Sequence, residues 1–329
     1  MSEHKSKQQY WLGIDLGGTK ILAEVYDQDF KLIGSKKRKT KAELGQKAGL
    51  ERLLKTAREA VEDADLKSGQ LCGVGIGCPG VLNLNTGMLI KAPNLGWKDV
   101  PIQDILAKEF DAPAAVANDV DAGTFGEFTC GAGKGATSVF GIFPGTGIGG
   151  ALIYEGKIFK GRNQSCMEIG HLQAVPNGPL CGCGRKGCLE AVAGRLAIST
   201  AASAAVIRGQ APWLQKNVGS DPANIRSGAL ADAVKNGDKI IEELIIDSCN
   251  SLGKVLGGIV NLLAPDVMII GGGLAEAMPT LYLETVRTAM EPKIMNAFIG
   301  SCELRIAQLG DHATALGAAA WIKSQQEQV

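Results

Sequence analysis

The chain has 329 residues, which exceeds one typical domain and allows a large buried core. Its 34 basic residues equal its 34 acidic ones, so no charge excess indicates nucleic acid, and the expected partner is a small molecule. Nine cysteines, an odd number, and a polar first segment, MSEHKSKQQY, predict a reducing cytoplasm. No apolar run predicts a membrane span, because the longest candidate, residues 257–270, contains Asn261, Pro265 and Asp266.

Residues 11–34 predict a meander of strands, and Gly17 and Gly18 make its first turn. The turn lies in IDLGGTK, where backbone N–H groups and a threonine hydroxyl can meet phosphate oxygens. The nearby carboxylate of Asp15 can hold hydrated Mg²⁺, which prefers oxygen ligands and keeps its waters. The alternative is a plain hairpin in which Asp15 makes only a local turn hydrogen bond.

An amphipathic helix is predicted over residues 46–62, where leucines recur at helical spacing. A buried strand, CGVGIGCPG, follows, and after a loop around KAPNLGW a short helix is predicted over residues 101–110. In the loop, Asn94 offers an amide to a polyhydroxylated ligand, and Trp97 offers an apolar face nearby.

Asn118 and Asp119 end the next strand, AAVAND, and precede a predicted helix. One interpretation is a helix N-cap, which accepts hydrogen bonds from the first free backbone donors. The functional interpretation is a base, because a carboxylate at the end of a strand can take a hydroxyl proton during attack on a phosphate. Asp121 lies within the helix start, where it suits the helix dipole better than proton transfer.

A second hairpin is predicted over residues 137–161, and its tip, GTGIGG, runs from Gly145 to Gly150. The glycines only loosely fit a dinucleotide-binding fingerprint, because that fingerprint opens a helix and ALIYEGKIF predicts a strand. We therefore predict a second phosphate-contacting hairpin. Its likeness to the first hairpin suggests a distant internal duplication.

The segment from Glu168 to Glu190 combines one histidine with a C-x-C-x4-C cluster. Three thiolates and one imidazole suit tetrahedral structural zinc, and the alternative is a set of reduced, buried thiols. Glu168 and Glu190 offer hydrogen bonds to a polyhydroxylated ligand, although solvated surface acids are the ordinary alternative. A zinc-bound histidine also keeps its second ring nitrogen for a substrate. The predicted zinc ligands are His171, Cys181, Cys183 and Cys188.

Residues 228–262 predict helices, APDVMIIGGG predicts a strand, and the last helix is predicted from about Ala313 to Ile322. Strands that alternate with helices, together with two hairpins, favour an α/β protein with mixed sheets. A cleft between two lobes is the expected ligand site.

In combination and in this order, IDLGGTK, the ND after an apolar strand, GTGIGG, EIGH with CGCGRKGCLE, and IIGGG resemble the ROK family of sugar kinases and repressors. The resemblance runs from about residue 11 to the end. It implies an actin-like (ribonuclease H-like), two-lobed ATPase fold with a smaller lobe of residues 1–119, completed by the C-terminal helix 311–329. Residues 120–310 form the larger lobe with the zinc-binding loop. The departure VDAGTFGE after Asp119 is expected to alter helix packing more than chemistry.

The resemblance also implies roles for single residues. Asp119 is the general base for the sugar hydroxyl, Asp15 faces Mg²⁺ through water, and Gly272 and Gly273 lie near the adenosine. The implied sugar contacts are Asn94, Asn118, Asp119, Glu168, His171 and Glu190. The implied contacts to the ATP phosphates are Gly17, Gly18, Thr19, Lys20, Gly145, Thr146 and Gly147.

The activity implied by the resemblance is ATP- and Mg²⁺-dependent phosphorylation of the 6-hydroxyl of an aldohexose, and glucose is the expected substrate. The expected protein is a cytoplasmic homodimer that acts in carbohydrate metabolism. Repressor members carry a DNA-binding segment before the kinase-like part, and the short polar segment here argues against it. An N-acetylmannosamine or N-acetylglucosamine kinase and a catalytically silent sugar sensor stay open as alternatives. Polyphosphate in place of ATP is open as well.

Overall fold

The computed structural model describes residues 8–67, 69–162 and 166–327, which divide into two compact units. Unit 1 lies within residues 1–135, 157–166 and 311–329, and unit 2 within residues 136–156 and 167–310. The chain therefore first leaves unit 1 after Gly135, whereas the sequence predicts a boundary after Asp119. The physical reason is that the helix starting at Asp119 packs against the C-terminal helix of unit 1.

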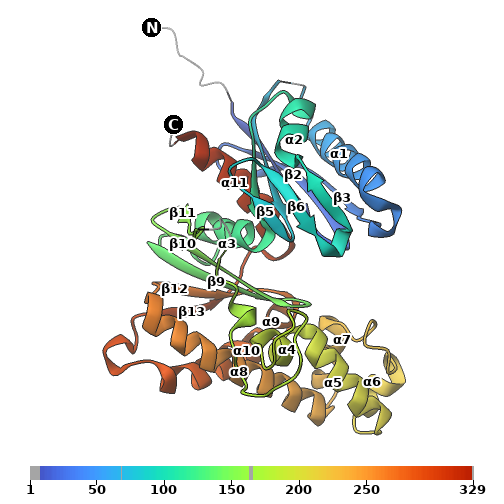
Figure 1. Cartoon of the computed structure of the whole chain (residues 1–329), viewed down its shortest axis with the longest axis vertical. Helices are drawn as coiled ribbons and strands as arrows, with labels where there is room; N and C mark the ends of the chain where they lie inside the picture. Colours follow the sequence, from blue (N-terminus) through green and yellow to red (C-terminus); the bar gives the residue numbers. More distant parts are fainter. Residues whose placement is uncertain (1–7, 68, 163–165, 328–329) are drawn as a thin grey trace. The chain divides into compact units, whose positions relative to one another are not determined.

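Unit 1 is built on a five-stranded sheet in which three parallel strands are extended by an antiparallel pair (Figure 1). In sheet order the strands are β3 (Leu32–Lys39), β2 (Lys20–Asp27), β1 (Tyr10–Leu16), β4 (Leu71–Cys78) and β8 (Ala114–Asn118). The helices of unit 1 are α1 (Gly45–Asp63), α2 (Ile102–Phe110), α3 (Asp119–Cys130) and α11 (Ala313–Glu327). The short strand β11 (Lys157–Ile158) lies in the same unit.

Helices α1 and α11 cover opposite faces of this sheet. The strand register places Gly13 of β1 and Gly34 of β3 on opposite faces, because side chains alternate along β2 between them. A Cβ on Gly34 would lie 2.5 Å from the Ala60 carbonyl oxygen of α1, and one on Gly13 would lie 1.9 Å from that of Ala315 in α11. Glycine thus lets both helices lie directly on the strands, and β1 and β2 are buried between them.

Helix α11 also packs closely against α3. A Cβ on Gly317 of α11 would lie only 1.7 Å from the Ala122 carbonyl oxygen of α3, and one on Gly126 would lie 2.4 Å from the Ala313 carbonyl oxygen. The two helices therefore touch backbone to backbone. Gly126 of VDAGTFGE therefore serves this packing.

A second, antiparallel sheet of unit 1 occupies residues that the sequence predicts as a loop. Trp97, predicted to offer an apolar face to a ligand, is only 2% exposed. Its indole ring packs on α1, where a Cβ on Gly49 would lie 2.5 Å from the ring. The prediction for Trp97 is therefore wrong, because the residue belongs to the core. The strands of this sheet are β5 (Val81–Asn83), β6 (Met88–Ala92) and β7 (Trp97–Val100).

The sheet of unit 2 repeats the arrangement of unit 1. An antiparallel hairpin, β9 and β10, is followed on the β9 side by two parallel strands, β12 and β13. The same succession is found for β2, β1, β4 and β8, and it is in keeping with the predicted internal duplication. The bounds are β9 (Ser138–Pro144), β10 (Ile148–Tyr154), β12 (Val267–Ile270) and β13 (Glu303–Ile306).

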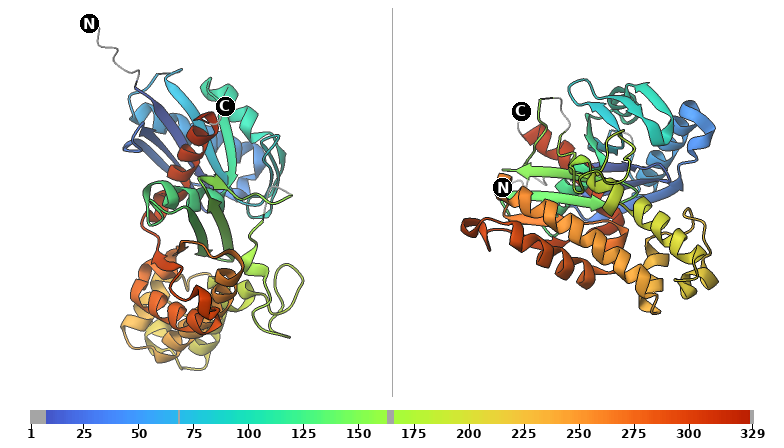
Figure 2. Two further views of the ribbon diagram at one scale, coloured as in Figure 1. Left: turned by 90° about the vertical axis from the view of Figure 1, so that its left-hand side faces the viewer. Right: turned by 60° about the horizontal axis from the view of Figure 1, so that its bottom comes forward.

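Helices pack on this sheet and supply most of the core of unit 2. The long helix α8 lies beside α10 (Figure 2), and a Cβ on Gly253 of α8 would lie 2.4 Å from the Val286 carbonyl oxygen of α10. The helices are α4 (Leu189–Ala193), α5 (Arg195–Ile207), α6 (Pro212–Asn217), α7 (Ser227–Lys235), α8 (Lys239–Leu263), α9 (Gly273–Ala277) and α10 (Pro279–Met290). The 3₁₀ turns of the chain are η1 (Ala42–Leu44), η2 (Pro93–Leu95), η3 (Ile169–His171), η4 (Glu291–Lys293), η5 (Asn296–Phe298) and η6 (Gly310–His312).

One helical stretch, Leu189–Ile207, is long and apolar enough for a membrane span by length and composition alone. Gly194 divides it into α4 and α5, and Leu189, Ile198 and Ala202 lie in the core of unit 2. Because a core helix passes the same test of length and composition, the stretch is weak evidence for a membrane span.

Candidate active site

The first glycine-rich turn, between β1 and β2, is fixed within unit 1. The Gly17 N–H donates to the Lys20 carbonyl at 2.9 Å, and the Thr40 hydroxyl donates to the Gly17 carbonyl at 2.6 Å. The Thr40 N–H also donates to the Thr19 carbonyl at 2.9 Å. Gly18 and Thr19 are exposed. A fixed turn with exposed N–H groups and a hydroxyl is suited to bind phosphate oxygens.

Asp15 lies at the end of β1 and is only 8% exposed. Burial raises the pKa of its carboxyl from 3.8 to about 7, and Lys20 opposes this shift while Asp119 and Asp311 add to it. A buried carboxyl of this kind ionises more readily when a cation arrives. Asp15 can therefore serve as an acceptor for the water shell of Mg²⁺.

Lys20, predicted to grip phosphate, is already paired with acids. Its Nζ lies 2.7 Å from Asp311 Oδ1 and 3.7 Å from Asp15 Oδ2. Lys37 Nζ lies 2.8 Å from Asp311 Oδ2, and the hydrogen bonds from the two lysines lower the pKa of Asp311 to about 2. Much of the positive charge of Lys20 is thus balanced inside unit 1.

Asp119 is the first residue of α3. The N-cap is its neighbour, because the carboxamide oxygen of Asn118 accepts from the N–H groups of Val120 at 2.9 Å and Asp121 at 3.4 Å. Asp119 Oδ1 accepts from the Val120 N–H at 3.0 Å, and the Thr314 hydroxyl donates to the Asp119 carbonyl at 3.3 Å. The capping interpretation therefore applies to Asn118, and Asp119 is held at a helix N-terminus.

The ends of parallel strands bring Asp15 and Asp119 to one edge of the sheet. Gly77 of β4 pairs with Asp15, and a Cβ on Gly77 would lie 3.5 Å from the Asp119 Cα. Asn94 reaches the neighbouring turn, because a Cβ on Gly18 would lie 3.5 Å from the Asn94 Cβ. Unit 1 thus gathers a carboxylate pair, an amide and a glycine turn at the edge where ligands bind in open α/β sheets.

The second glycine-rich turn, between β9 and β10, is held by the start of α5. The Gly145 N–H donates to the Gly147 carbonyl at 2.8 Å, which closes the turn. The Arg195 N–H donates to the Gly145 carbonyl at 2.9 Å, and Arg195 Nη2 donates to Thr146 Oγ1 at 2.8 Å. A Cβ on Gly147 would lie 2.1 Å from Glu190 Oε2, so a side chain there would displace the Glu190 carboxylate from the turn.

The glycines after β12 lie beside this turn. Because β12 runs parallel to β9, the two strands end at the same edge of the sheet. Gly272 has a φ of +89°, and a Cβ there would lie 2.5 Å from the Pro144 carbonyl oxygen; Gly273 lies beside the Ser227 side chain. Unit 2 therefore brings together GTGIGG and IIGGG, the two glycine sequences for which the family resemblance implies nucleotide contacts.

The four predicted zinc ligands come together, and their ligand atoms all lie within 4.8 Å of one another. Cys181 Sγ is 3.6 Å from His171 Nδ1, and Cys183 Sγ is 3.6 Å from Cys188 Sγ. Tetrahedral zinc with Zn–S bonds of about 2.3 Å places two sulfurs about 3.8 Å apart, so these residues fit the metal. Hydrogen bonds from the backbone and side chain of Arg185 lower the pKa of the Cys183 thiol to about 6, which favours a thiolate.

Glycines allow this loop to fold on itself. Gly184 and Gly187 have φ values of +86° and +75°, in the region that L side chains avoid. A Cβ on Gly187 would also lie 1.7 Å from the Val175 carbonyl oxygen. The Cys181 N–H then donates to the Arg185 carbonyl at 2.8 Å, which closes a tight turn around the cluster.

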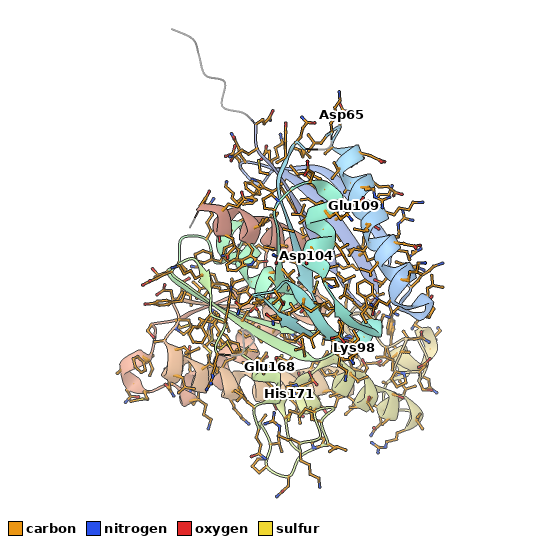
Figure 3. All side chains as sticks on the ribbon, turned by 45° about the horizontal axis from the view of Figure 1, so that its top comes forward. Asp65, Lys98, Asp104, Glu109, Glu168 and His171 are labelled. Carbon is orange, nitrogen blue, oxygen red and sulfur yellow. The ribbon has the colours of Figure 1, made fainter. Side chains whose placement is uncertain are left out.

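Glu168 and Glu190 are both joined to the cluster, but in different ways. The exposed Glu168 accepts with its carbonyl from the His171 N–H at 3.0 Å, and Figure 3 shows the two side chains near each other. The half-buried Glu190 has Oε1 3.7 Å from Cys181 Sγ, and its Oε2 accepts from the Ile148 N–H at 3.1 Å. Glu168 is thus an exposed acid beside the cluster, whereas Glu190 also supports the β9–β10 turn.

The sequence pattern of the ROK family matches residues 11–325. The chain belongs to the ROK family. A glucokinase of Thermotoga maritima is 32% identical over 318 residues, which cover 95% of this chain and 97% of that relative. The solved ROK glucokinase of Streptomyces griseus, in complex with glucose and AMPPNP, is 28% identical with a TM-score of 0.81 and covers 95% of this chain and 98% of its own. The ROK hexokinase of Thermus thermophilus is 31% identical with a TM-score of 0.79 and covers 96% and 99%.

These similarities confirm the predicted ROK family and the predicted actin-like fold with mixed sheets. Three residues of this ROK chain that support the candidate site were not predicted. Thr40 fixes the first turn, Arg195 contacts the second, and Asp311 holds Lys20. Thr40 and Arg195 lie outside any motif, whereas Asp311 stands in GDHATALG, where an acid before a helix resembles an ordinary cap.

Proposed function

We propose that the protein transfers the terminal phosphoryl group of ATP to the 6-hydroxyl of glucose in the presence of Mg²⁺. The observation that carries the proposal is the pairing of Asp15 and Asp119 at one sheet edge, beside the Gly17–Lys20 turn. Membership of the ROK family and similarity to proteins named glucokinase support it.

Phosphoryl transfer depends on positioning and on electrostatic stabilisation. In this proposal Asp119 takes the proton of the 6-hydroxyl while that oxygen attacks the terminal phosphorus of ATP, and the bond from this phosphorus to the bridging oxygen breaks so that ADP leaves. The Asn118 cap and the Thr314 hydroxyl hold the start of α3, so the carboxylate has a defined position. Asp15 would hold hydrated Mg²⁺, and such an ion would supply positive charge to balance the phosphate oxygens.

The remaining site residues divide between sugar and nucleotide. Gly272 and Gly273 accommodate the adenosine, since a Cβ on Gly272 would lie 2.5 Å from the Pro144 carbonyl oxygen and one on Gly273 would lie 3.1 Å from Ser227 Oγ. The proposed sugar contacts are Asn94, Asn118, Asp119, Glu168, His171 and Glu190. The proposed phosphate contacts are Gly17, Gly18, Thr19, Lys20, Gly145, Thr146 and Gly147.

Replacing Asp119 by asparagine tests the base. The variant should bind glucose nearly as well as the wild type, while kcat falls by about 100- to 10,000-fold, because general base catalysis typically contributes that much. Asp104→Asn is the matched control, since Asp104 is an exposed acid in the first turn of α2. A coupled assay for ADP gives kcat, and calorimetry gives glucose affinity. Near-normal turnover in the Asp119→Asn variant would exclude the base.

His171, Cys181, Cys183 and Cys188 hold structural zinc in this proposal. Cys181, Cys183 and Cys188 form no disulfide, which leaves their sulfurs available as thiolate ligands. The metal supplies a fixed crosslink within the loop. The residues themselves then set the positions of Glu168, through His171, and of Glu190, through Cys181.

Metal analysis and chelation test the zinc proposal. Purified protein should contain about one zinc per chain, and Cys183→Ser should lose the metal and lower the melting temperature. Cys302→Ser is the control, because Cys302 lies outside the cluster. Metal-free protein with unchanged stability and activity would contradict a structural role.

Two other functions are compatible with the same fold. An N-acetylmannosamine or N-acetylglucosamine kinase would differ in the surroundings of the sugar 2-position, and catalytic efficiencies across hexoses and amino sugars separate the two. A catalytically silent sugar sensor would bind glucose without consuming ATP. Polyphosphate belongs in the same assay as an alternative donor. A homodimer is proposed from the family alone, and light scattering tests it.

A further inference from the structure

A basic residue outside the GTGIGG sequence, Arg195, contacts the β9–β10 turn. Arg195 donates from Nη2 to Thr146 Oγ1 at 2.8 Å, and its N–H donates to the Gly145 carbonyl at 2.9 Å. Gly194 makes this approach possible, because a Cβ there would lie 3.2 Å from the Thr146 carbonyl oxygen and 2.7 Å from that of Glu190. The first residue of α5 is therefore fixed against the turn by both its backbone and its side chain.

The charge balance of Arg195 differs from that of Lys20. Across residues 8–67, 69–162 and 166–327, no carboxylate oxygen lies within 4.0 Å of the Arg195 guanidinium, whereas Lys20 is paired with Asp311 at 2.7 Å. The guanidinium carries five N–H donors in a planar fork, and its bond to Thr146 uses only one nitrogen. Donors that match phosphate geometry thus stay available at the turn.

The turn itself needs a positive charge if it is to bind phosphate. Glu190 Oε2 accepts from the Ile148 N–H at 3.1 Å and would lie 2.1 Å from a Cβ on Gly147, so a carboxylate stands directly at the turn. That charge repels phosphate. GTGIGG contains no cation of its own, and Arg195 is the residue in contact with it that supplies one.

We propose that Arg195 binds the phosphate chain of the donor nucleotide at the Gly145–Gly147 turn. This inference rests on the proposed kinase function and adds a cationic phosphate contact from unit 2. The guanidinium donates to phosphate oxygens while Thr146 Oγ1 holds it in place. The residue is thereby a binding group for the donor and takes no part in proton transfer.

Nucleotides of different phosphate content test the proposal. In Arg195→Ala, affinities for AMPPNP and ADP should fall by about 10- to 100-fold, because a hydrogen bond to a charged group is worth about 1.5–3 kcal/mol. Adenosine affinity and the KM for glucose should stay unchanged, and Arg195→Lys should recover part of the loss. Arg208→Ala is the matched control, since Arg208 is exposed at the other end of α5.

Two results would overturn the proposal. Equal losses for adenosine and AMPPNP would mean that the substitution only deforms the turn, because Gly272 packs against the same turn at Pro144. The second result is that Arg195→Ala causes no further loss of AMPPNP affinity in protein that already carries Thr146→Val. It would mean that Arg195 acts only through Thr146. Both results come from calorimetry of nucleotide binding in the absence of sugar. The kinase function is tested separately: wild-type protein that releases no ADP in the presence of ATP and glucose would refute it.

Discussion

Replacing Asp15 by asparagine should stabilise the fold at neutral pH and abolish phosphoryl transfer. The Asp15 carboxyl is 8% exposed, and burial raises its pKa from 3.8 to about 7. One pKa unit corresponds to about 1.4 kcal/mol, so an ionised Asp15 costs the folded state about 4 kcal/mol. Asparagine keeps nearly the same shape without this cost, whereas a water-mediated Mg²⁺ contact through a carboxylate is lost.

The effect should depend on pH with a defined sign. Below about pH 4 the carboxyl is neutral in the folded and the unfolded chain, so the variant and the wild type should have similar stability. Between about pH 4 and 7 the unfolded chain releases the proton first, and the stability of the wild type relative to the variant falls as the pH rises. Above the folded pKa of about 7 the advantage of Asp15→Asn should approach 4 kcal/mol.

Guanidinium unfolding without added Mg²⁺, at a series of pH values from about 4 to 8, measures this difference. Asp29→Asn is the control, because Asp29 is an exposed acid in the β2–β3 turn. The coupled ADP assay should give a kcat reduced by on the order of 100-fold or more. A stability difference that does not change with pH, or a variant less stable at about pH 8, would refute the reasoning.

Two further substitutions test the packing that positions the site. Gly317→Ala should destabilise the protein by about 3 kcal/mol and reduce kcat, since its Cβ would lie 1.7 Å from the Ala122 carbonyl oxygen of α3. Gly258→Ala in α8 is the control, because nothing lies within 4 Å of a Cβ at that position. If denaturant unfolding gives Gly317→Ala the stability of the wild type, the close contact between α11 and α3 is contradicted. Trp97→Phe should lower the free energy of unfolding by about 1–3 kcal/mol and leave the KM for glucose unchanged, because Trp97 is buried in the core. A raised KM with normal stability would instead indicate that Trp97 contacts the sugar.

The local predictions succeeded where one short segment contains all the information. The four residues proposed to bind zinc are close in sequence, and the intervening glycines reach dihedrals that let the loop close, so their clustering follows from composition and spacing. Helix α1 is also found over nearly the predicted residues, because its apolar side chains recur at helical spacing. The ROK motifs identified the family for the same reason.

The less successful predictions concern residues whose environment is made by distant segments. Trp97 stands in a segment that resembles an open loop, but α1 covers it from far away in the sequence. Likewise Asn118 and Asp119 are equivalent candidates for a cap until the backbone of α3 shows that Asn118 accepts the hydrogen bonds. Arg195 has no local signal, and only the approach of α5 to the β9–β10 turn gives it a place near phosphate.

The sequence by itself determined the ROK family, the glycine turns, the Cys/His cluster and the two aspartates, because each is encoded in a few consecutive residues. Only the tertiary structure decided that Asp15 and Asp119 share one sheet edge, that α3 belongs with α11, and that Lys20 is balanced by Asp311. Parallel strands and close helix contacts bring together residues far apart in the chain. Burial and the balance of charge follow from those contacts, and local sequence does not record them.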